Sequence, residues 1–531
     1  MRNMGLEIIN AARSHGGAVA LRHKRDGKYH QYTYQQMAEA MEQVAAGLVE
    51  KGIRAGDRVG IFAPNLPEWL IADYAILSVR AVTVPIYATN TTGQVRAIAE
   101  DSGMRMLLVG TEVEYERARE VLETCPALER LVILDEGFQP GDHQTISFAE
   151  LRQADPAPEV VADIEQRRAA TAPDDLATII YTSGTTGQPK GAQLSHGNFV
   201  NQHTTLDTRF NVSSSDSSLC FLPLSHVYER SWSAYVHLRG ATNVILSDPK
   251  QVVVTLAEVR PTVMVSAPRL YEKVYSAVLA KAESSPPVRR KIFYWALGVG
   301  EEYWQAHYAG QEMSGGLKWR YWWADKLVLA KIRNVVGGPK NFFSSGGAAL
   351  DRNIEEFFLK VGLLICQGYG LTETAPMLTC NSPGDFKFGT VGRPIDDVEI
   401  RIADTGEIQV KGPNVFSGYF GMPEANAEAF TEGWFRTGDI GRLDEDGFLL
   451  ITDRLKDLIV TSGGKNVAPQ RIEKLVGKDF YIDQLAVMGD KRKFVSAIIV
   501  PAFDNLREFA NQKKLQFKDH EELIKLPEVV E

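Results

Sequence analysis

The chain has 531 residues, which is enough for two to four domains. Hydrophobic residues make up 44% and charged residues 24%, as in ordinary soluble globular proteins, and the net charge of −9 argues against a dedicated nucleic-acid-binding protein. Four cysteines without paired spacing indicate a reducing compartment and no zinc site, and no run of eighteen apolar residues is present that could span a membrane, so we expect a cytoplasmic protein.

Short apolar strands alternate with amphipathic helices from residue 1 to residue 174. The predicted helices are 34–52, 67–79 and 94–103, and the predicted strands are 59–63, 81–87 and 106–109. This alternation predicts a mainly parallel sheet covered by helices on both faces. Residues 154–173 are rich in alanine, proline, aspartate and glutamate, and we interpret them as a surface connection.

A glycine-rich segment, YTSGTTGQPKG at 181–191, follows the apolar strand 176–180. Such a loop exposes backbone N–H groups, while hydroxyl side chains and Lys190 add donors and a mobile positive charge, so the loop can wrap a polyphosphate. The alternative is a flexible linker. The segment is not a Walker A motif, because Pro189 precedes Lys190 and Gly191 follows it.

The next motif is LPLSHVYER at 222–230. A lone histidine beside an apolar run is more often structural than functional. Residues 281–340 then hold five tryptophans interleaved with lysines and arginines. This stretch is either an aromatic-rich helical hairpin packed on the main sheet or a patch that contacts a membrane surface.

Two further glycine-rich loops follow buried strands. FFSSGGAALD at 342–351 carries Gly346 and Gly347, and Asp351 is placed to cap a helix that begins near Arg352. The strand 363–366 leads into QGYGLTET at 367–374. In open α/β sheets ligands bind beyond the carboxyl ends of strands, so three such loops predict a nucleotide-binding crevice.

The hydrophobic period changes to two between residues 391 and 450. Strands are expected at 397–402, 406–412 and 447–452, which together form a small β subdomain. The charged segment 453–458 is interpreted as a polar linker between two β segments.

Taken together, these motifs resemble those of the adenylate-forming enzymes, which include acyl-CoA synthetases, adenylation domains of peptide synthetases and luciferases. The resemblance covers roughly residues 20 to 500 and includes five motifs in the expected order. LPLSHVYER is similar to the branch of long-chain fatty acyl-CoA synthetases. The implied fold is α/β: a large N-terminal domain (1–452) of mainly parallel sheets with a small β subdomain, a hinge (453–458), and a small, mobile α+β C-terminal domain (459–531).

The resemblance also implies a reaction. A fatty acid carboxylate attacks the α-phosphorus of ATP with Mg²⁺ bound, giving acyl-adenylate and pyrophosphate, and the thiol of CoA then displaces AMP. Both steps gather negative charge, so positioned cations and N–H donors are expected to dominate catalysis. The alternatives are a fatty acyl-AMP ligase that delivers to a carrier protein, and a non-catalytic acyl- or nucleotide-binding relative. A water-insoluble substrate is compatible with a peripheral position at the inner membrane surface.

Site residues are carried over from the resemblance by motif. The phosphates are assigned to Thr182, Ser183, Gly184, Thr185, Thr186, Gly187 and Lys190. Adenine is assigned to Gly346, Gly347, Ala348, Gln367, Gly368, Tyr369 and Gly370. Mg²⁺ is assigned to Thr182 and Glu373, the α-phosphate to Thr372, and the ribose to Asp439 and Arg454. The acyl chain is assigned to His226, Tyr228 and Trp232; CoA to Gly463, Gly464, Lys465 and Asn466; and the hinge to Asp453 and Lys456. Lys190, Thr372, Glu373 and Arg454 are the predicted catalytic residues.

One element of the resembled family has no counterpart here. These enzymes carry a C-terminal lysine that acts in adenylation, and none of Lys513, Lys514, Lys518 and Lys525 is assigned that role. Residues 521–526 form an amphipathic segment interrupted by Pro527, and Val529 and Val530 are expected to have nothing to pack on. From this pattern we expect the natural protein to continue beyond Glu531.

Overall fold

The computed structural model describes residues 3–135, 137–138, 144–183, 189–455, 459–460, 466–467, 469–477, 479–490 and 492–530. The chain divides into two compact units. Unit 1 comprises residues 1–400, 410–435 and 445–449, and unit 2 comprises residues 401–409, 436–444 and 450–531. Unit 2 therefore holds parts of the predicted β subdomain in addition to the predicted C-terminal domain, and the hinge at 453–458 stays a prediction.

A seven-stranded sheet forms one part of unit 1, with strand order β7-β6-β5-β3-β4-β8-β9. Its strands are β3 (Arg58–Ala63), β4 (Val82–Tyr87), β5 (Met106–Val109), β6 (Arg130–Ile133), β7 (Thr145–Ser147), β8 (Leu176–Ser183) and β9 (Pro189–Ser195). All neighbours are parallel except β8 and β9, which are antiparallel. The helices that alternate with them are α2 (Tyr34–Glu50), α3 (Pro67–Ser78), α4 (Thr92–Ser102), α5 (Glu112–Thr124), α6 (Phe148–Leu151) and α7 (Pro158–Ala170).

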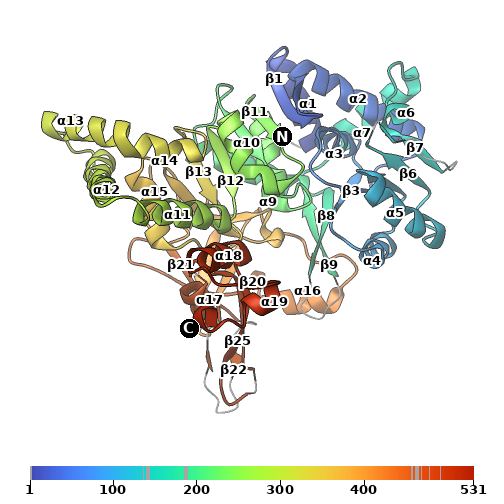
Figure 1. The fold of residues 1–531 in the computed structure, drawn as a ribbon. Helices are drawn as coiled ribbons and strands as arrows, with labels where there is room; N and C mark the ends of the chain where they lie inside the picture. Colours follow the sequence, from blue (N-terminus) through green and yellow to red (C-terminus); the bar gives the residue numbers. More distant parts are fainter. Residues whose placement is uncertain are drawn as a thin grey trace. The chain divides into compact units, whose positions relative to one another are not determined.

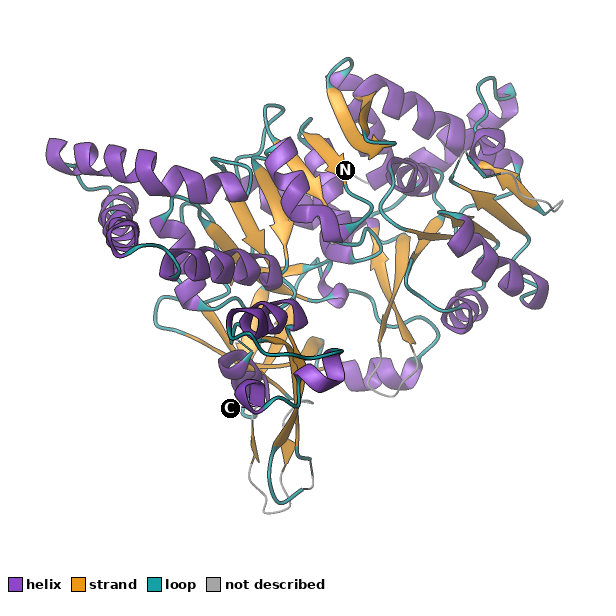
Figure 2. Ribbon diagram, viewed as in Figure 1, coloured by secondary structure: helices purple, strands orange, loops and turns teal. Residues whose placement is uncertain are grey.

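A nine-stranded sheet forms the other part of unit 1, in the order β16-β15-β14-β13-β12-β10-β11-β1-β2 (Figures 1 and 2). Its strands are β1 (Val19–Arg25), β2 (Lys28–Thr33), β10 (Ser217–Cys220), β11 (Thr242–Ile245), β12 (Val263–Ser266), β13 (Phe342–Ser345), β14 (Ile365–Gly370), β15 (Met377–Cys380) and β16 (Arg393–Pro394). The run from β14 to β1 is parallel, and antiparallel strands close both ends. The predicted class, mainly parallel sheets covered by helices, is confirmed.

Unit 1 contains further helices. They are α1 (Met4–His15), α8 (His196–Arg209), α9 (Val227–Leu238), η1 (Pro249–Gln251), α10 (Val252–Val259), α11 (Pro268–Glu283), α12 (Pro287–Tyr308), α13 (Gly315–Ala324), the π-helical turn η2 (Asp325–Leu329), α14 (Ala330–Val335), α15 (Arg352–Lys360), η3 (Thr372–Thr374) and α16 (Pro423–Ala429). Asp351 caps α15 by accepting a hydrogen bond from the Asn353 backbone N–H, as predicted.

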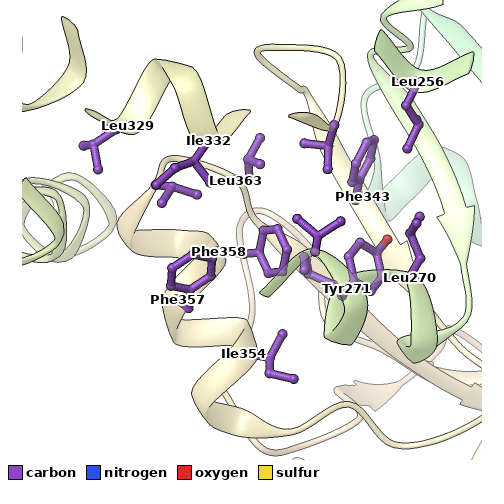
Figure 3. Close-up of a cluster of buried hydrophobic side chains, with 14 of the residues drawn as sticks. Leu256, Leu270, Tyr271, Leu329, Ile332, Phe343, Ile354, Phe357, Phe358 and Leu363 are labelled. Atoms are coloured by element: carbon purple, nitrogen blue, oxygen red, sulfur yellow. The ribbon is translucent and has the colours of Figure 1, made fainter. Parts of the chain in front are cut away.

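One hydrophobic cluster joins the nine-stranded sheet to the helices between residues 268 and 360. Phe343 of β13 lies close to Tyr271 of α11, and Phe358 of α15 packs edge-on against the same tyrosine (Figure 3). Leu317 of α13 and Leu329 of η2 belong to this cluster too. Residues 281–340 therefore do pack on the main sheet as an aromatic-rich helical hairpin, and contact of their exposed side with a membrane surface stays a prediction.

A five-stranded sheet contains β17 (Glu399–Ile402), β18 (Glu407–Lys411), β19 (Phe430–Thr431), β20 (Trp434–Leu443) and β21 (Leu449–Arg454). Its order is β17-β18-β20-β19, with β21 paired to β20, which confirms the predicted small β subdomain. Unit 2 continues with β22 (Ile459–Val460), β23 (Asn466–Val467), α17 (Pro469–Val476), β24 (Ile482–Met488), β25 (Ser496–Pro501), α18 (Phe503–Gln512), α19 (His520–Leu523) and α20 (Pro527–Val530).

Two expectations from the sequence are wrong. Residues 154–173 are not merely a surface connection, because they contain helix α7, which buries Ile164 and Arg168. Val529 does have a packing partner, since it lies against a small cluster built on Leu506 and Leu523, whereas Val530 is exposed. Over the described part of the chain, no helix has the length and apolarity needed to cross a lipid bilayer.

Candidate active site

The glycine-rich segment after β8 lies at the turn of an antiparallel pair. Thr182 of β8 is paired with Lys190 of β9, and the Thr182 hydroxyl donates a hydrogen bond of 3.4 Å to the Lys190 carbonyl oxygen. Gly184, Thr185, Thr186 and Gly187 lie outside the described residues, as does the side chain of Ser183. The structure therefore describes the two ends of the predicted phosphate loop.

Lys190 and Glu373 both contact one tyrosine, Tyr419. The Lys190 ammonium nitrogen lies 5.1 Å from the centre of the Tyr419 ring, which is a cation–π contact. The Tyr419 hydroxyl donates a hydrogen bond of 2.9 Å to Oε1 of Glu373. Two site residues predicted from motifs more than 180 positions apart thus belong to one cluster.

Backbone pairing explains how Tyr419 reaches this position. The segment 416–420 forms a bridge with β9, in which the Phe420 N–H donates to the Gly191 carbonyl at 2.8 Å. The same segment reaches the other motif, because the Phe416 N–H donates to the Glu373 carbonyl at 2.8 Å. Burial, followed by the charge and hydrogen bond of Glu373, raises the pKa of Tyr419, so the phenol stays protonated and keeps its donor role.

The glycines of FFSSGGAALD follow β13 and are held by a glutamine of the neighbouring strand. Gln367 of β14 accepts a hydrogen bond from the Leu350 N–H at 2.8 Å and donates one to the Leu350 carbonyl at 3.3 Å. Gly347 has a φ of 79°, a conformation that favours glycine, and Gly347 and Ala348 are exposed. Because β13 and β14 are parallel neighbours, both loops leave the same edge of the sheet, as the sequence predicted.

The loop after β14 carries the other adenine and phosphate candidates. Gly370 approaches the backbone so closely that a Cβ there would lie 1.7 Å from the Pro376 carbonyl oxygen, so no other residue fits without rearrangement. Thr372 begins the short helix η3, and Glu373 is nearly buried within it. Gly368 and Tyr369 lie in β14 itself, directly before this loop.

Two of the three predicted acyl-binding residues lie at the start of α9. His226 caps the helix by accepting a hydrogen bond from the Tyr228 N–H at 3.1 Å, and burial lowers its pKa, so the ring is neutral near pH 7. The ring of Tyr228 lies against Gly346, where a Cβ would be only 3.0 Å from the ring. The predicted acyl and adenine residues therefore adjoin each other.

The third predicted acyl-binding residue, Trp232, is 4% exposed, and its indole N–H donates to the Ser218 hydroxyl at 2.9 Å. Arg230, on the same helix, is fully buried and forms a two-pronged ion pair with Asp73, at 2.6 and 2.7 Å. The ion pair gives Arg230, the last residue of LPLSHVYER, a structural role that the sequence did not indicate. Binding of acyl chains by Trp232 stays a prediction.

Within unit 2, Asp439 and Arg454 form an ion pair of 3.0 Å. Asp439 is 5% exposed, and its backbone N–H donates to the Thr437 hydroxyl at 3.1 Å. The Asp453 carboxylate accepts a hydrogen bond from the Arg454 N–H at 2.8 Å. Lys456, Gly463, Gly464 and Lys465 lie outside the described residues, and Asn466 belongs to the short strand β23.

The residues present fit a magnesium ion that is held partly by the protein and partly by the phosphates of a bound nucleotide. Across the described ranges, no group of three or more histidine, cysteine, aspartate or glutamate side chains is gathered in a way that could hold a metal. Mg²⁺ commonly uses one or two carboxylates together with phosphate oxygens and water, and Glu373 supplies one such carboxylate.

Comparison with known proteins places this geometry in a family. Residues 9–420 match the family described as AMP-binding enzyme, and residues 456–525 match the AMP-binding enzyme C-terminal domain. The chain belongs to the AMP-binding enzyme family. One relative is a protein named long-chain-fatty-acid–CoA ligase FadD15 from Mycobacterium tuberculosis, which is 40% identical over 484 residues, covering 89% of this chain and 78% of that protein.

A further sequence relative is more distant, and two solved structures share the fold. A rat protein named long-chain-fatty-acid–CoA ligase ACSBG1 is 31% identical and covers 93% of this chain and 70% of its own length. The solved structure of an anthranilate CoA ligase, AuaEII, in complex with anthranoyl-AMP has a TM-score of 0.73 at 19% identity, covering 97% of this chain and 91% of that one. ATP-bound MatB from Rhodopseudomonas palustris has a TM-score of 0.68 at 23% identity, with 98% and 91% covered.

Proposed function

We propose that the protein is a long-chain fatty acid–CoA ligase that forms an acyl-adenylate from ATP and transfers the acyl group to CoA, releasing AMP and pyrophosphate. The observation that carries the proposal is the 40% identity over 89% of the chain to relatives that bear this name. The cluster of Lys190, Tyr419 and Glu373 supports it, because it supplies the charges that the first half-reaction needs.

The chain's own residues divide the work of adenylation. Lys190 balances the negative charge of the β- and γ-phosphates. The Thr182 hydroxyl, on the strand position paired with Lys190, would help Glu373 to hold Mg²⁺. Glu373 would hold Mg²⁺, and the chemistry that this ion would supply is neutralisation of phosphate charge. Thr372 donates to the α-phosphate as the carboxylate attacks. Stabilisation of developing charge by fixed groups is commonly the largest contribution to such catalysis.

Adenine and ribose are assigned to separate groups of residues. Gly347 and Ala348 are exposed and Gly346 is buried beside them, so this segment presents no bulky side chain to an adenine that packs against it. Asp439 accepts hydrogen bonds from the ribose hydroxyls, and Arg454, its partner in the ion pair, is positioned to contact the ribose or the phosphates. Asn466, together with the glycines and the lysine of 463–465, approaches the pantetheine arm of CoA during the second half-reaction.

The deciding experiment measures AMP release from the 531-residue protein with ATP, Mg²⁺, CoA and a series of straight-chain acids. Each buried methylene contributes about 0.8 kcal/mol, so the apparent affinity is expected to rise by roughly fourfold per methylene until the acyl site is filled. AMP release that depends on CoA and favours long chains supports the proposal. Acyl-AMP that accumulates despite CoA identifies an acyl-AMP ligase instead, and preference for acetate or an aromatic acid contradicts the substrate assignment.

A further inference from the structure

Helix α13 and the π-helical turn η2 expose a face of large aromatic side chains. Trp319, Trp322 and Trp323 are 65%, 52% and 37% exposed, and Leu327 beside them is 42% exposed. We call these residues, together with Lys326, the α13 aromatic face. Clustered exposure of this kind generally marks an interaction site, whereas scattered apolar residues do not.

The face is held rigidly by the opposite side of the same helix. Leu317, Ala324 and Leu329 are buried in the core cluster that Figure 3 shows in part. In addition, Tyr321 stacks on Tyr303 of α12 with ring centres 3.8 Å apart. The exposed tryptophans are therefore presented by an anchored helix, which lies with α12 at one edge of unit 1 (Figure 1). The turn that follows α13 is π-helical, a rare geometry that is frequent at functional sites.

Positive charge accompanies these rings. The Lys326 ammonium lies 4.9 Å from the Trp322 ring centre and 5.8 Å from that of Trp323. Although the whole chain has a net charge of −9, residues 287–335 contain eight lysines and arginines against four acidic residues. Two of the acidic side chains, Glu302 and Asp325, are already paired with arginines.

The composition distinguishes between kinds of partner. Protein–protein interfaces enrich aromatic residues and arginine but deplete lysine. Indole rings beside lysines suit the headgroup region of a bilayer, where the ring is half-immersed and the ammonium meets lipid phosphate. In the described part of the chain, neither Lys318 nor Lys326 forms an ion pair, so both ammonium groups are available to such phosphates.

We propose that the α13 aromatic face docks unit 1 on the surface of an anionic phospholipid bilayer. The bilayer would also be the source of the acid, a part of the inference that rests on the proposed function because long-chain acids partition into membranes. Docking is peripheral: the rings enter the headgroup layer while the helix stays parallel to the surface.

The test is co-sedimentation of the full chain with phosphatidylcholine vesicles that either contain or lack phosphatidylglycerol. Binding is expected with the anionic vesicles and is expected to weaken as salt increases, because the charge contribution is screened. Substitution of Trp319, Trp322 and Trp323 by serine together should reduce binding by at least about tenfold. Lys318→Glu should weaken it by about fivefold or more, given the usual contribution of one basic residue at such a surface.

Matched controls separate docking from general surface effects. Lys28→Glu makes the same charge change on β2, and Phe494→Ser removes another side chain that is 69% exposed; both should bind as the unmodified protein does. A variant with the three tryptophans replaced by phenylalanine should still bind but lose the quenching of its fluorescence by brominated lipid. Because all three side chains are exposed, thermal denaturation is expected to stay unchanged.

Three results would overturn the docking proposal: no sedimentation with anionic vesicles, equal binding by the triple serine variant, or a lipid-free dimer that the triple serine variant dissociates, which would make the face an interface between copies. AMP release with a dissolved medium-chain acid keeps the two proposals apart. Activity without vesicle binding contradicts only the docking surface, and vesicle binding without activity on any acid contradicts only the ligase assignment.

Discussion

At the scale of single residues, the sequence identified the charged groups of the site but not the residue between them. Lys190 and Glu373 belong to motifs with glycine and hydroxyl neighbours, which carry a chemical signature in any sequence. Tyr419 has no such signature: it becomes part of the site through a backbone bridge to Ala192, more than 220 positions away. Pairing between such distant segments leaves no periodicity by which one sequence could reveal it.

Removal of either charged group should slow adenylation strongly. Lys190→Ala and Glu373→Ala are each expected to reduce the rate of pyrophosphate release by at least ~100-fold, the usual effect of losing one transition-state contact. Glu356→Ala, a change of a partly exposed carboxylate on α15, is the control and should leave the rate unchanged. Near-normal pyrophosphate release in either site variant would refute its assignment.

Tyr419→Phe tests whether the tyrosine positions Glu373. The substitution keeps the ring under Lys190 and removes only the hydroxyl that donates to Glu373. Hydrogen bonds to charged groups contribute about 1.5–3 kcal/mol, so a loss of roughly ten- to a hundredfold in pyrophosphate release is expected. If the loss acts through metal binding, higher Mg²⁺ concentration should recover part of it, a response that a general loss of stability would not give.

The comparison for Tyr419 is Tyr235→Phe. Tyr235 of α9 also donates to a carboxylate, Asp207 at 3.0 Å, but it is not among the site residues. The Tyr235→Phe variant should release pyrophosphate at the same rate, and with the same dependence on magnesium concentration, as the unmodified protein. The same magnesium response in both variants would remove the case for a special role of Tyr419.

At the scale of elements, strands and helices with clear periodicity were predicted well. The strand 106–109 has the bounds that the structure gives, and helix 34–52 differs from α2 by two residues at its end. Helix α7 was missed because it buries little apolar surface: only Ile164 and Arg168 are buried, and its N-cap residue, Ala157, has no capping side chain. A helix without an apolar stripe resembles a loop in composition.

Helix α9 shows how a functional motif also carries structure. Arg230 reaches from α9 to Asp73 of α3 and donates to the Thr178 hydroxyl of β8 at 2.7 Å, so it ties the helix to the seven-stranded sheet. Arg230→Met leaves the Asp73 carboxylate buried without its partner. We expect this variant to lose about 3–5 kcal/mol of stability, measured by urea denaturation.

Two comparisons make the stability prediction specific. Arg352→Ala breaks an exposed pair with Glu356 on α15 and should cost no more than about 0.5 kcal/mol. Replacing Arg230 and Asp73 together by apolar residues of similar size should recover much of the loss, because no charge is then buried alone. Equal stability of Arg230→Met and the unmodified protein would mean that the buried pair does not stabilise the fold.

At the scale of the whole molecule, the sequence predicted the class of fold, and the domain boundary at 453–458 stays a prediction. Three glycine-rich loops after strands indicated a nucleotide site at one sheet edge, and β13 and β14 confirm that two of them leave neighbouring parallel strands. The compact units follow contacts rather than chain order, so unit 2 gains residues 401–409 and 436–444 from within the long N-terminal stretch. The sequence predicted a single boundary, at 453–458, because strand pairing between separated segments is not visible in composition.

The segment 453–458 remains the proposed pivot between the two half-reactions. Asp453 and Arg454 end β21, and Lys456 lies outside the described residues. Hinges concentrate large backbone changes in a few residues at the ends of elements. Lys456→Pro fixes φ and removes an N–H, so it should slow one half-reaction far more than the other, whereas Lys456→Ala leaves the backbone free and serves as the control. The two rates are measured separately, as pyrophosphate release without CoA and as thioester formation from supplied acyl-AMP. If both fall equally in a folded Lys456→Pro protein, the two half-reactions do not need different conformations of this segment, and the pivot must be sought elsewhere in the chain.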